Sequence, residues 1–147
     1  METNQIIENN RLIAEFMDFK KVRSSNKIKD YYLPRELWFY VDGINDSKPF
    51  DYDTDTELIK ECYPEQMRFS TSWDWLMPVV EKIESLDLDK ILPSYGNIIL
   101  RTYSKYYSRF ESINSQSLHF PDVYGKTKIL SIYNAVVEFI KWFDKNK

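Results

Sequence analysis

The sequence has few of the residues from which hydrolytic and metal-dependent sites are usually built. Its 147 residues include one cysteine, one histidine and three glycines. A single cysteine excludes an internal disulfide, and one cysteine with one histidine excludes a Cys/His zinc site. No glycine-rich phosphate-binding loop can be recognised among so few glycines. These common enzyme classes therefore have no support in the composition.

Long apolar runs are also missing, since none approaches the roughly 20 residues needed to cross a bilayer. The stretch from Met1 to Gln5 carries no basic patch before an apolar segment, so we expect no signal peptide. A lone cysteine fits a reducing compartment. We therefore expect a cytoplasmic protein that does not engage membranes.

Neither His119 nor Cys62 has the sequence surroundings of a catalytic residue. His119 stands between Leu118 and Phe120, which is typical of a strand or core histidine, and a general base needs an oriented partner. Cys62 stands among acidic residues, which disfavour the reactive thiolate. We expect no catalytic residue, no cofactor and no enzymatic activity, while any other role for these two residues stays open.

The residues that are present indicate one folded domain. The chain is 43% hydrophobic and 16% aromatic, which is enough to form a core. Apolar residues at helical spacing predict helices over about Gln5–Asp18, from Ser70–Ser72 to Leu86, and over about Lys126–Lys145. Thr71 and Asp74 approximate a capping box for the middle helix, and Pro78 should either kink the helix or separate its first turn from the rest. The last helix should be mostly buried, with Ser131 among its few solvated residues.

Strands are predicted where aromatic and β-branched residues gather. Glu36–Val41 and Asn97–Ser104 are good candidates, and Arg109–Ile113 and Ser117–Phe120 are weaker ones. Lys20–Lys29 is predicted to be a connection and Glu57–Cys62 a short helical turn. The predicted fold class is α+β, with a small, mainly antiparallel sheet packed with three helices in one domain over residues 1–147.

An acidic segment, residues 42–65, has eight acidic residues and two lysines in a chain of net charge -3. Its alternating carboxylates suggest a cation loop, but Thr56 replaces the required glycine and Cys62 the terminal glutamate. We therefore expect no metal site. The segment is either a solvated loop or a surface for a basic partner. The candidate partner-binding residues are Asp51, Asp53, Asp55, Glu57 and Glu61.

An aromatic segment supplies the other candidate partner-binding residues, Tyr103, Tyr106 and Tyr107. Basic residues are interleaved with them, and cations with stacking rings can hold a single nucleic-acid strand. The same tyrosines could instead line a half-buried sheet. The sequence pI of about 5.3 opposes broad phosphate affinity, so direct nucleic-acid binding is the alternative and not the favoured function.

Three blocks of the chain, Ile13–Met17, Thr71–Glu84 and Ile132–Trp142, together resemble the phage ABA-sandwich domain, a family of small bacteriophage and prophage proteins. The resemblance implies an α/β sandwich and no known activity. This chain has Asp18 where a glycine often follows the first block. It also looks enlarged at 41–65 and 104–125, which we expect to be inserted segments that add function.

These observations together predict a non-enzymatic phage or prophage protein that binds a host protein in the bacterial cytoplasm. One example is a counter-defence inhibitor of a CRISPR-Cas effector, which is itself a nucleic-acid-binding protein. The alternatives are a nucleic-acid-binding accessory protein and, less favoured, a metal-dependent enzyme that uses the carboxylates of the acidic segment. The sequence leaves the identity of the partner and the oligomeric state open.

Overall fold

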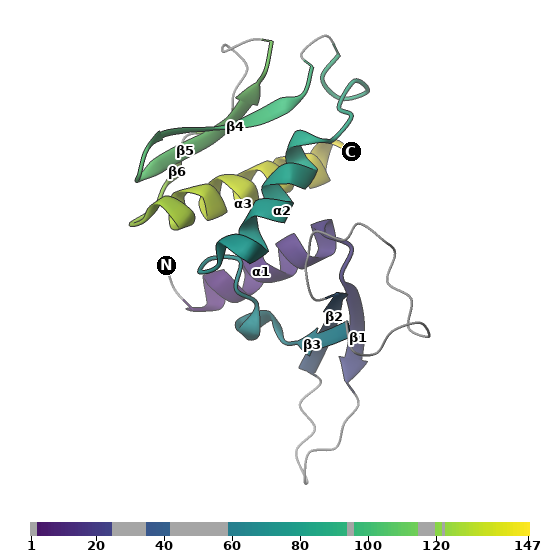
Figure 1. Cartoon of the computed structure of the whole chain (residues 1–147). Helices are drawn as coiled ribbons and strands as arrows, with labels where there is room; N and C mark the ends of the chain where they lie inside the picture. The colour runs from purple at the N-terminus through teal and green to yellow at the C-terminus, as the bar shows by residue number, and fades with distance from the viewer. Residues whose placement is uncertain (1–2, 25–34, 42–58, 94–95, 115–119, 122) are drawn as a thin grey trace. The chain divides into compact units, whose positions relative to one another are not determined.

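The computed structural model describes residues 3–24, 35–41, 59–93, 96–114, 120–121 and 123–147 (Figure 1). For 20–24, 35–41 and 59–62 it describes the backbone alone. The chain divides into two compact units, Met1–Met67 and Arg68–Lys147. The described residues contain three α-helices and two three-stranded antiparallel sheets, which confirms the predicted α+β class. That all of the chain forms one domain stays a prediction.

The first unit is built around a sheet with the strand order β1-β2-β3. Both pairings are antiparallel, with Val22 opposite Leu37 and Phe39 opposite Glu61. The predicted first helix and the strand at Glu36–Val41 are confirmed. The elements of this unit are α1 (Thr3–Phe16), β1 (Lys20–Ser24), β2 (Arg35–Val41), β3 (Ile59–Cys62) and the short 3-10 helix η1 (Pro64–Gln66).

Two predictions in the first unit were wrong. Lys20–Ser24, expected to be a connection, forms β1, and Ile59–Cys62, expected to be a helical turn, forms β3. Both strands hydrogen-bond to β2, from opposite sides. The local sequence patterns do not show this pairing, because the backbone partners come from residues distant in sequence.

The backbone just after α1 has a conformation that suits a glycine, although this chain has Asp18 there. Asp18 has a φ of 61°, the left-handed conformation that favours glycine and that aspartate tolerates. The Phe19 amide donates to the Ala14 carbonyl at 2.9 Å, and the Asp18 amide donates to Glu15 at 3.1 Å. This is the Schellman pattern, which satisfies carbonyls that the end of a helix leaves unpaired.

Asn10 connects α1 to η1 within the first unit. Its side-chain amide donates to the Pro64 carbonyl at 2.9 Å and to the Met67 carbonyl at 3.3 Å. The residue has no exposed surface. A buried polar side chain must be hydrogen-bonded, and here the bonds hold the chain segment after β3 against the helix.

The second unit places two helices on one face of the sheet β4-β5-β6 (Figure 1). The predicted middle and last helices and the strand at Asn97–Ser104 are confirmed, and the weaker strand at Arg109–Ile113 corresponds to most of β5. Residues 117–119 of the other weak candidate lie outside the described residues. The elements are α2 (Trp73–Glu84), β4 (Ile98–Ser104), β5 (Tyr107–Ser112), β6 (Val123–Tyr124) and α3 (Lys128–Asn146).

The core of the second unit lies between α3 and the sheet. Val136 and Ile140 of α3 have no exposed surface and Ile132 only 3%, in agreement with the predicted burial of the last helix. The rings of Phe110 in β5 and Phe139 in α3 lie 5.4 Å apart. Side chains alternate between the two faces of a strand. Because Phe110 points into the core, its neighbours Arg109 and Glu111 point to the opposite face.

Ser131 was predicted to be solvated, but it is fully buried on the core side of α3. Its Oγ lies 3.0 Å from Ser108 Oγ of β5 and donates to the Lys128 carbonyl at 2.8 Å. The prediction was wrong because it assumed that a polar residue in this helix would be exposed. A small hydroxyl with two partners can be buried at a helix–sheet contact.

The start of α2 also differs from expectation. The residue that caps it is Ser72, and its side chain makes no capping hydrogen bond, so the predicted Thr71–Asp74 capping box is not formed. Pro78 lies inside one continuous helix. Trp75 is buried, whereas Trp73 is 42% exposed.

Candidate functional site

The sheet of the second unit has an outer face, opposite the core, that is rich in tyrosine and arginine. Its register places Arg101 opposite Arg109 and Tyr107 opposite Tyr124. Because side chains alternate along each strand, one row of residues points outward from all three strands. We call this the tyrosine face and define it as Arg101, Tyr103, Tyr107, Arg109, Glu111 and Tyr124.

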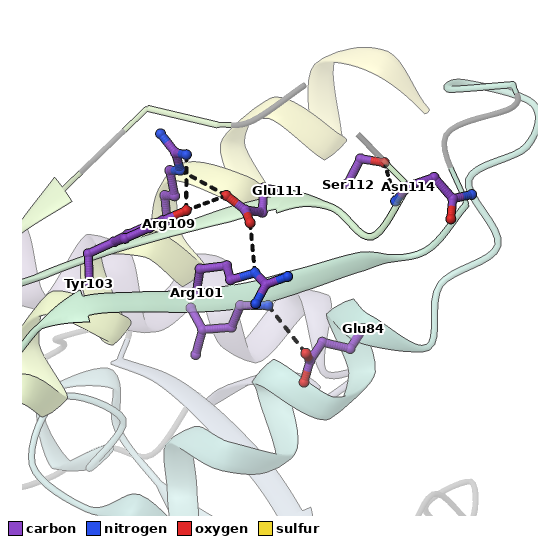
Figure 2. Close-up of polar contacts among 8 residues, drawn as sticks. Glu84, Arg101, Tyr103, Arg109, Glu111, Ser112 and Asn114 are labelled. Carbon is purple, nitrogen blue, oxygen red and sulfur yellow. Dashed lines mark hydrogen bonds and ion pairs between the residues drawn. The ribbon is translucent and has the colours of Figure 1, made fainter. Parts of the chain in front are cut away.

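Glu111 is the centre of a polar cluster on the tyrosine face (Figure 2). Arg101 Nε donates to Glu111 Oε1 at 2.7 Å, while Tyr103 Oη and Arg109 Nε donate to Oε2 at 2.7 and 3.0 Å. Arg109 Nη2 also donates to Tyr103 Oη at 3.0 Å. The Glu111 side chain has no exposed surface. A buried carboxylate is tolerated only when charged and hydrogen-bonding partners surround it, as these do.

The protonation states of this cluster are set by the same contacts. Burial favours the neutral acid of Glu111, but the hydrogen bonds from Tyr103, Arg109 and Arg101 outweigh it, and the pKa of the carboxyl is lowered. The hydrogen bond to Glu111 is the main cause that raises the pKa of Tyr103 above its usual value. At neutral pH the carboxyl is therefore ionised and the phenol is protonated.

Three tyrosine rings form a ladder across the strands of the tyrosine face. Tyr103 and Tyr107 are stacked with ring centroids 5.4 Å apart, and Tyr107 and Tyr124 with centroids 5.3 Å apart. The Arg109 guanidinium lies 4.8 Å from the centroid of the Tyr103 ring. The two end rings are exposed, Tyr103 by 47% and Tyr124 by 71%, and the middle ring, Tyr107, is less exposed than either. The ladder thus begins at an arginine and ends at a largely exposed ring.

A second pair of a cation and a ring lies at the turn between β4 and β5. Lys105 Nζ is 4.7 Å from the centroid of the Tyr106 ring, and Tyr106 is 45% exposed. The Gly125 amide donates to the Tyr106 carbonyl at 2.8 Å, so this turn is joined to the end of β6. The turn therefore adds an exposed aromatic and an exposed lysine beside the tyrosine face.

The edge strand β4 is hydrogen-bonded to the end of α2. Glu84, the last residue of α2, accepts a hydrogen bond of 3.2 Å from the Leu100 amide of β4 (Figure 2). The Asn97 side chain donates to the Glu84 carbonyl, also at 3.2 Å. These bonds fix the position of β4, and with it Arg101 and Tyr103.

The structure brings together some of the predicted site residues. Tyr103 and Tyr107 stack on each other, and Tyr106 occupies the neighbouring turn. Glu61 lies in β3, where only the backbone is described, as is also true of Cys62. The other candidates and the lone histidine lie outside the described residues: Asp51, Asp53, Asp55, Glu57 and His119.

Sequence reasoning missed two residues of the tyrosine face. Glu111 follows Tyr107 and Arg109 at intervals of two, so strand alternation would have placed it on the same face. Tyr124 belongs to a strand of two residues, which is too short to produce a recognisable pattern.

No family model, curated protein or solved structure matches this chain. The resemblance to the phage ABA-sandwich domain therefore stays a prediction that depends on the three sequence blocks. In the part of the chain that the structure describes, no group of three or more His, Cys, Asp or Glu could hold a metal ion. Within that same part, every helix is too short or too polar to span a membrane.

Proposed function

We propose that this protein acts by binding another macromolecule through the tyrosine face, without catalysing a reaction. The observation that carries the proposal is the exposure of Tyr103 and Tyr124 on a sheet face whose opposite side is the core. Aromatic side chains exposed next to arginine are the residues that dominate binding energy in interfaces. Large aromatics have little reason to cluster on a solvated face unless something covers them.

The polar cluster supports positioning in preference to proton transfer. A general acid or base works best when its pKa lies near the working pH. The pKa shifts of Glu111 and Tyr103 move both groups away from neutrality, the carboxyl downward and the phenol upward. Glu111 instead holds Arg101, Tyr103 and Arg109 in fixed places, which reduces the entropy lost when a partner binds.

The cellular context of this function is a separate part of the proposal. The resemblance to phage proteins favours a protein that works in the bacterial cytoplasm on a host factor, and a defence effector such as a CRISPR-Cas protein is one such target. The acidic segment, residues 42–65, stays a second candidate surface for a basic partner. Its four central carboxylates are suited to a direct comparison with the tyrosine face.

Affinity capture from a bacterial lysate, followed by binding measurements with the purified partner, tests the proposal. Three variants of the full chain are compared with the wild type: Tyr103→Ser with Tyr124→Ser, Trp73→Ser as an exposed aromatic outside the face, and a variant with Asp51, Asp53, Asp55 and Glu57 neutralised. We expect only the tyrosine variant to lose the partner, by tenfold or more in affinity, on the order of one hot spot.

Two results would contradict the proposal. In one, the purified partner binds the tyrosine variant as tightly as the wild type. In the other, only the acidic variant loses binding, with a strong dependence on salt, which would place the surface on the acidic segment. Thermal melting of each variant shows whether a loss of binding reflects a loss of folding.

A further inference from the structure

The charge around the tyrosine face is opposite in sign to that of the whole chain. Residues 96–128 contain five basic residues and two acidic ones, a net charge of +3 in a chain of net charge -3. One of the two acids, Glu111, is buried beneath its three donors and presents no carboxylate surface. The basic residues are Arg101, Lys105, Arg109, Lys126 and Lys128.

The cations that a partner can reach lie beside the exposed rings. The Arg101 side chain remains 49% exposed even though its Nε is bonded to Glu111. Lys105 is exposed at the turn next to Tyr106, and Lys126 is exposed two residues after Tyr124. A partner with regularly spaced negative charges and flat rings would satisfy both kinds of group.

The ring ladder is a stack of aromatic rings whose last ring is exposed. Tyr103 lies between the Arg109 guanidinium and the Tyr107 ring, and Tyr107 lies between Tyr103 and Tyr124. The planes of Tyr107 and Tyr124 differ by only 16°. Tyr124, which is 71% exposed, ends the ladder among the described residues. A nucleobase is a flat ring that can continue such a stack, whatever its sequence.

We propose that the tyrosine face binds single-stranded nucleic acid. Bases stack on Tyr124 and on Tyr106, and phosphates pair with Arg101, Lys105 and Lys126. The proposal deepens the binding function above and rests on it. Charge complementarity favours a polyanion, and the row of stacked rings favours unpaired bases over an acidic protein segment. The bases of a duplex are already stacked on one another and are not free to extend the ladder.

Fluorescence anisotropy with labelled oligonucleotides tests this inference on the full chain. The probes are a 12-residue oligo(dT), an oligo(U) of equal length, a hairpin duplex and a polyglutamate peptide. We expect both single strands to bind more tightly than the duplex and the peptide. For single strands, the logarithm of the binding constant falls by about 0.7 per phosphate contact for each tenfold rise in salt. Three phosphate contacts should therefore lower the affinity about 20-fold between 50 and 200 mM salt.

Matched variants assign the binding to this face. Tyr124→Ser should weaken binding about tenfold through the lost stacking. Arg101→Gln should weaken it and make the salt dependence shallower by about 0.7. Trp73→Ser, an exposed aromatic of α2, and Lys141→Gln, an exposed cation of α3, serve as controls and should bind as the wild type does.

The inference is overturned if neither single strand binds at 50 mM salt, if the duplex or polyglutamate binds more tightly, or if the Tyr124 and Arg101 variants bind as the controls do. Failure of this inference differs from failure of the proposed function. A protein partner that is lost on Tyr124→Ser, with no oligonucleotide binding, would retain the function and reject the nucleic acid.

Discussion

The hydroxyl of Tyr103 donates a 2.7 Å hydrogen bond to Glu111, and thereby joins a ring that is 47% exposed to a carboxylate with no exposed surface. The two residues come from neighbouring strands, β4 and β5, and point to the same side of the sheet. The bond fixes one end of the ring while its stacking on Tyr107 fixes the face. The exposed ring of Tyr103 is therefore held by a carboxylate that solvent does not reach.

The first prediction concerns the loss of this buried charge. Glu111→Gln should lower the free energy of unfolding by about 1.5–3 kcal/mol, the usual contribution of hydrogen bonds to a charged group. Urea denaturation at neutral pH measures the difference. Glu138→Gln is the control, because Glu138 forms an exposed pair with Lys141 on α3, and such pairs contribute about 0–1 kcal/mol.

The contribution of Glu111 should also depend on pH. Its pKa is lower in the folded protein than in the unfolded chain, so its contribution is complete well above the ordinary glutamate pKa of about 4.3. The contribution is lost as the pH falls through the lower folded pKa. The difference in stability between wild type and Glu111→Gln should therefore shrink on acidification. A difference that stays constant between pH 7 and pH 3 would show that Glu111 does not contribute through its charge.

The second prediction concerns Asp18 at the end of α1. Replacement by glycine or alanine removes the same carboxylate, but only alanine has a side chain that is strained at a φ of 61°. We expect Asp18→Gly to be more stable than Asp18→Ala by about 1 kcal/mol. At Glu15, an exposed position inside the same helix, the order should be reversed by a similar amount. Thermal melting of the four variants measures both differences. If the alanine variant were more stable than the glycine variant at position 18 as well as at position 15, residue 18 would not have a left-handed conformation.

The helices were predictable because their signal is local. Ile132, Val136 and Ile140 recur every four residues, and this spacing alone placed them on one buried face of α3. The strands β1 and β3 were not, because each depends on pairing with β2, to which it is joined through a segment outside the described residues. A charged stretch such as Lys20–Ser24 carries no mark of the strand that will pair with it.

The candidate site was predictable only in part, for a similar reason. The interleaved tyrosines and basic residues at 101–107 were visible as a composition, and two of the tyrosines do lie on one face. The role of Glu111 depends on donors from β4 and β5 meeting at one carboxylate. That meeting follows from the register across the turn, which includes an irregularity between Thr102 and Ser104. The sequence of one strand does not reveal which residues of the neighbouring strand lie opposite it.

The third prediction tests the core of the second unit. Val136→Asp should abolish cooperative unfolding. Val136 has no exposed surface, so the carboxylate would be buried without a partner, which costs several kcal/mol. Total stabilities are about 5–15 kcal/mol, so the folded state should be largely lost. Lys141→Asp places the same side chain at an exposed position of α3 and should melt within a few degrees of the wild type. Circular dichroism during heating makes the comparison, and similar melting of the two variants would be incompatible with a buried Val136.

The last prediction concerns the hydroxyl pair that joins β5 to α3. Ser108 Oγ and Ser131 Oγ lie 3.0 Å apart, and neither residue has exposed surface. Ser108→Ala or Ser131→Ala alone leaves a buried hydroxyl with one partner fewer, so each should cost about 1 kcal/mol or more. The double variant removes both hydroxyls together and should cost less than the two single changes combined, by about 0.5–1 kcal/mol.

A double-mutant cycle from urea denaturation measures that coupling. Ser85, an exposed serine that donates to the Lys82 carbonyl at the end of α2, supplies the control cycle with Ser131. Ser85→Ala and Ser131→Ala should combine additively to within about 0.5 kcal/mol, because the two residues share no partner among the described contacts. Additive effects in the Ser108 cycle as well would mean that the two hydroxyls are merely adjacent. Coupling confined to that cycle would establish that α3 is held on the sheet by a specific polar contact as well as by the apolar packing of Phe110 and Phe139.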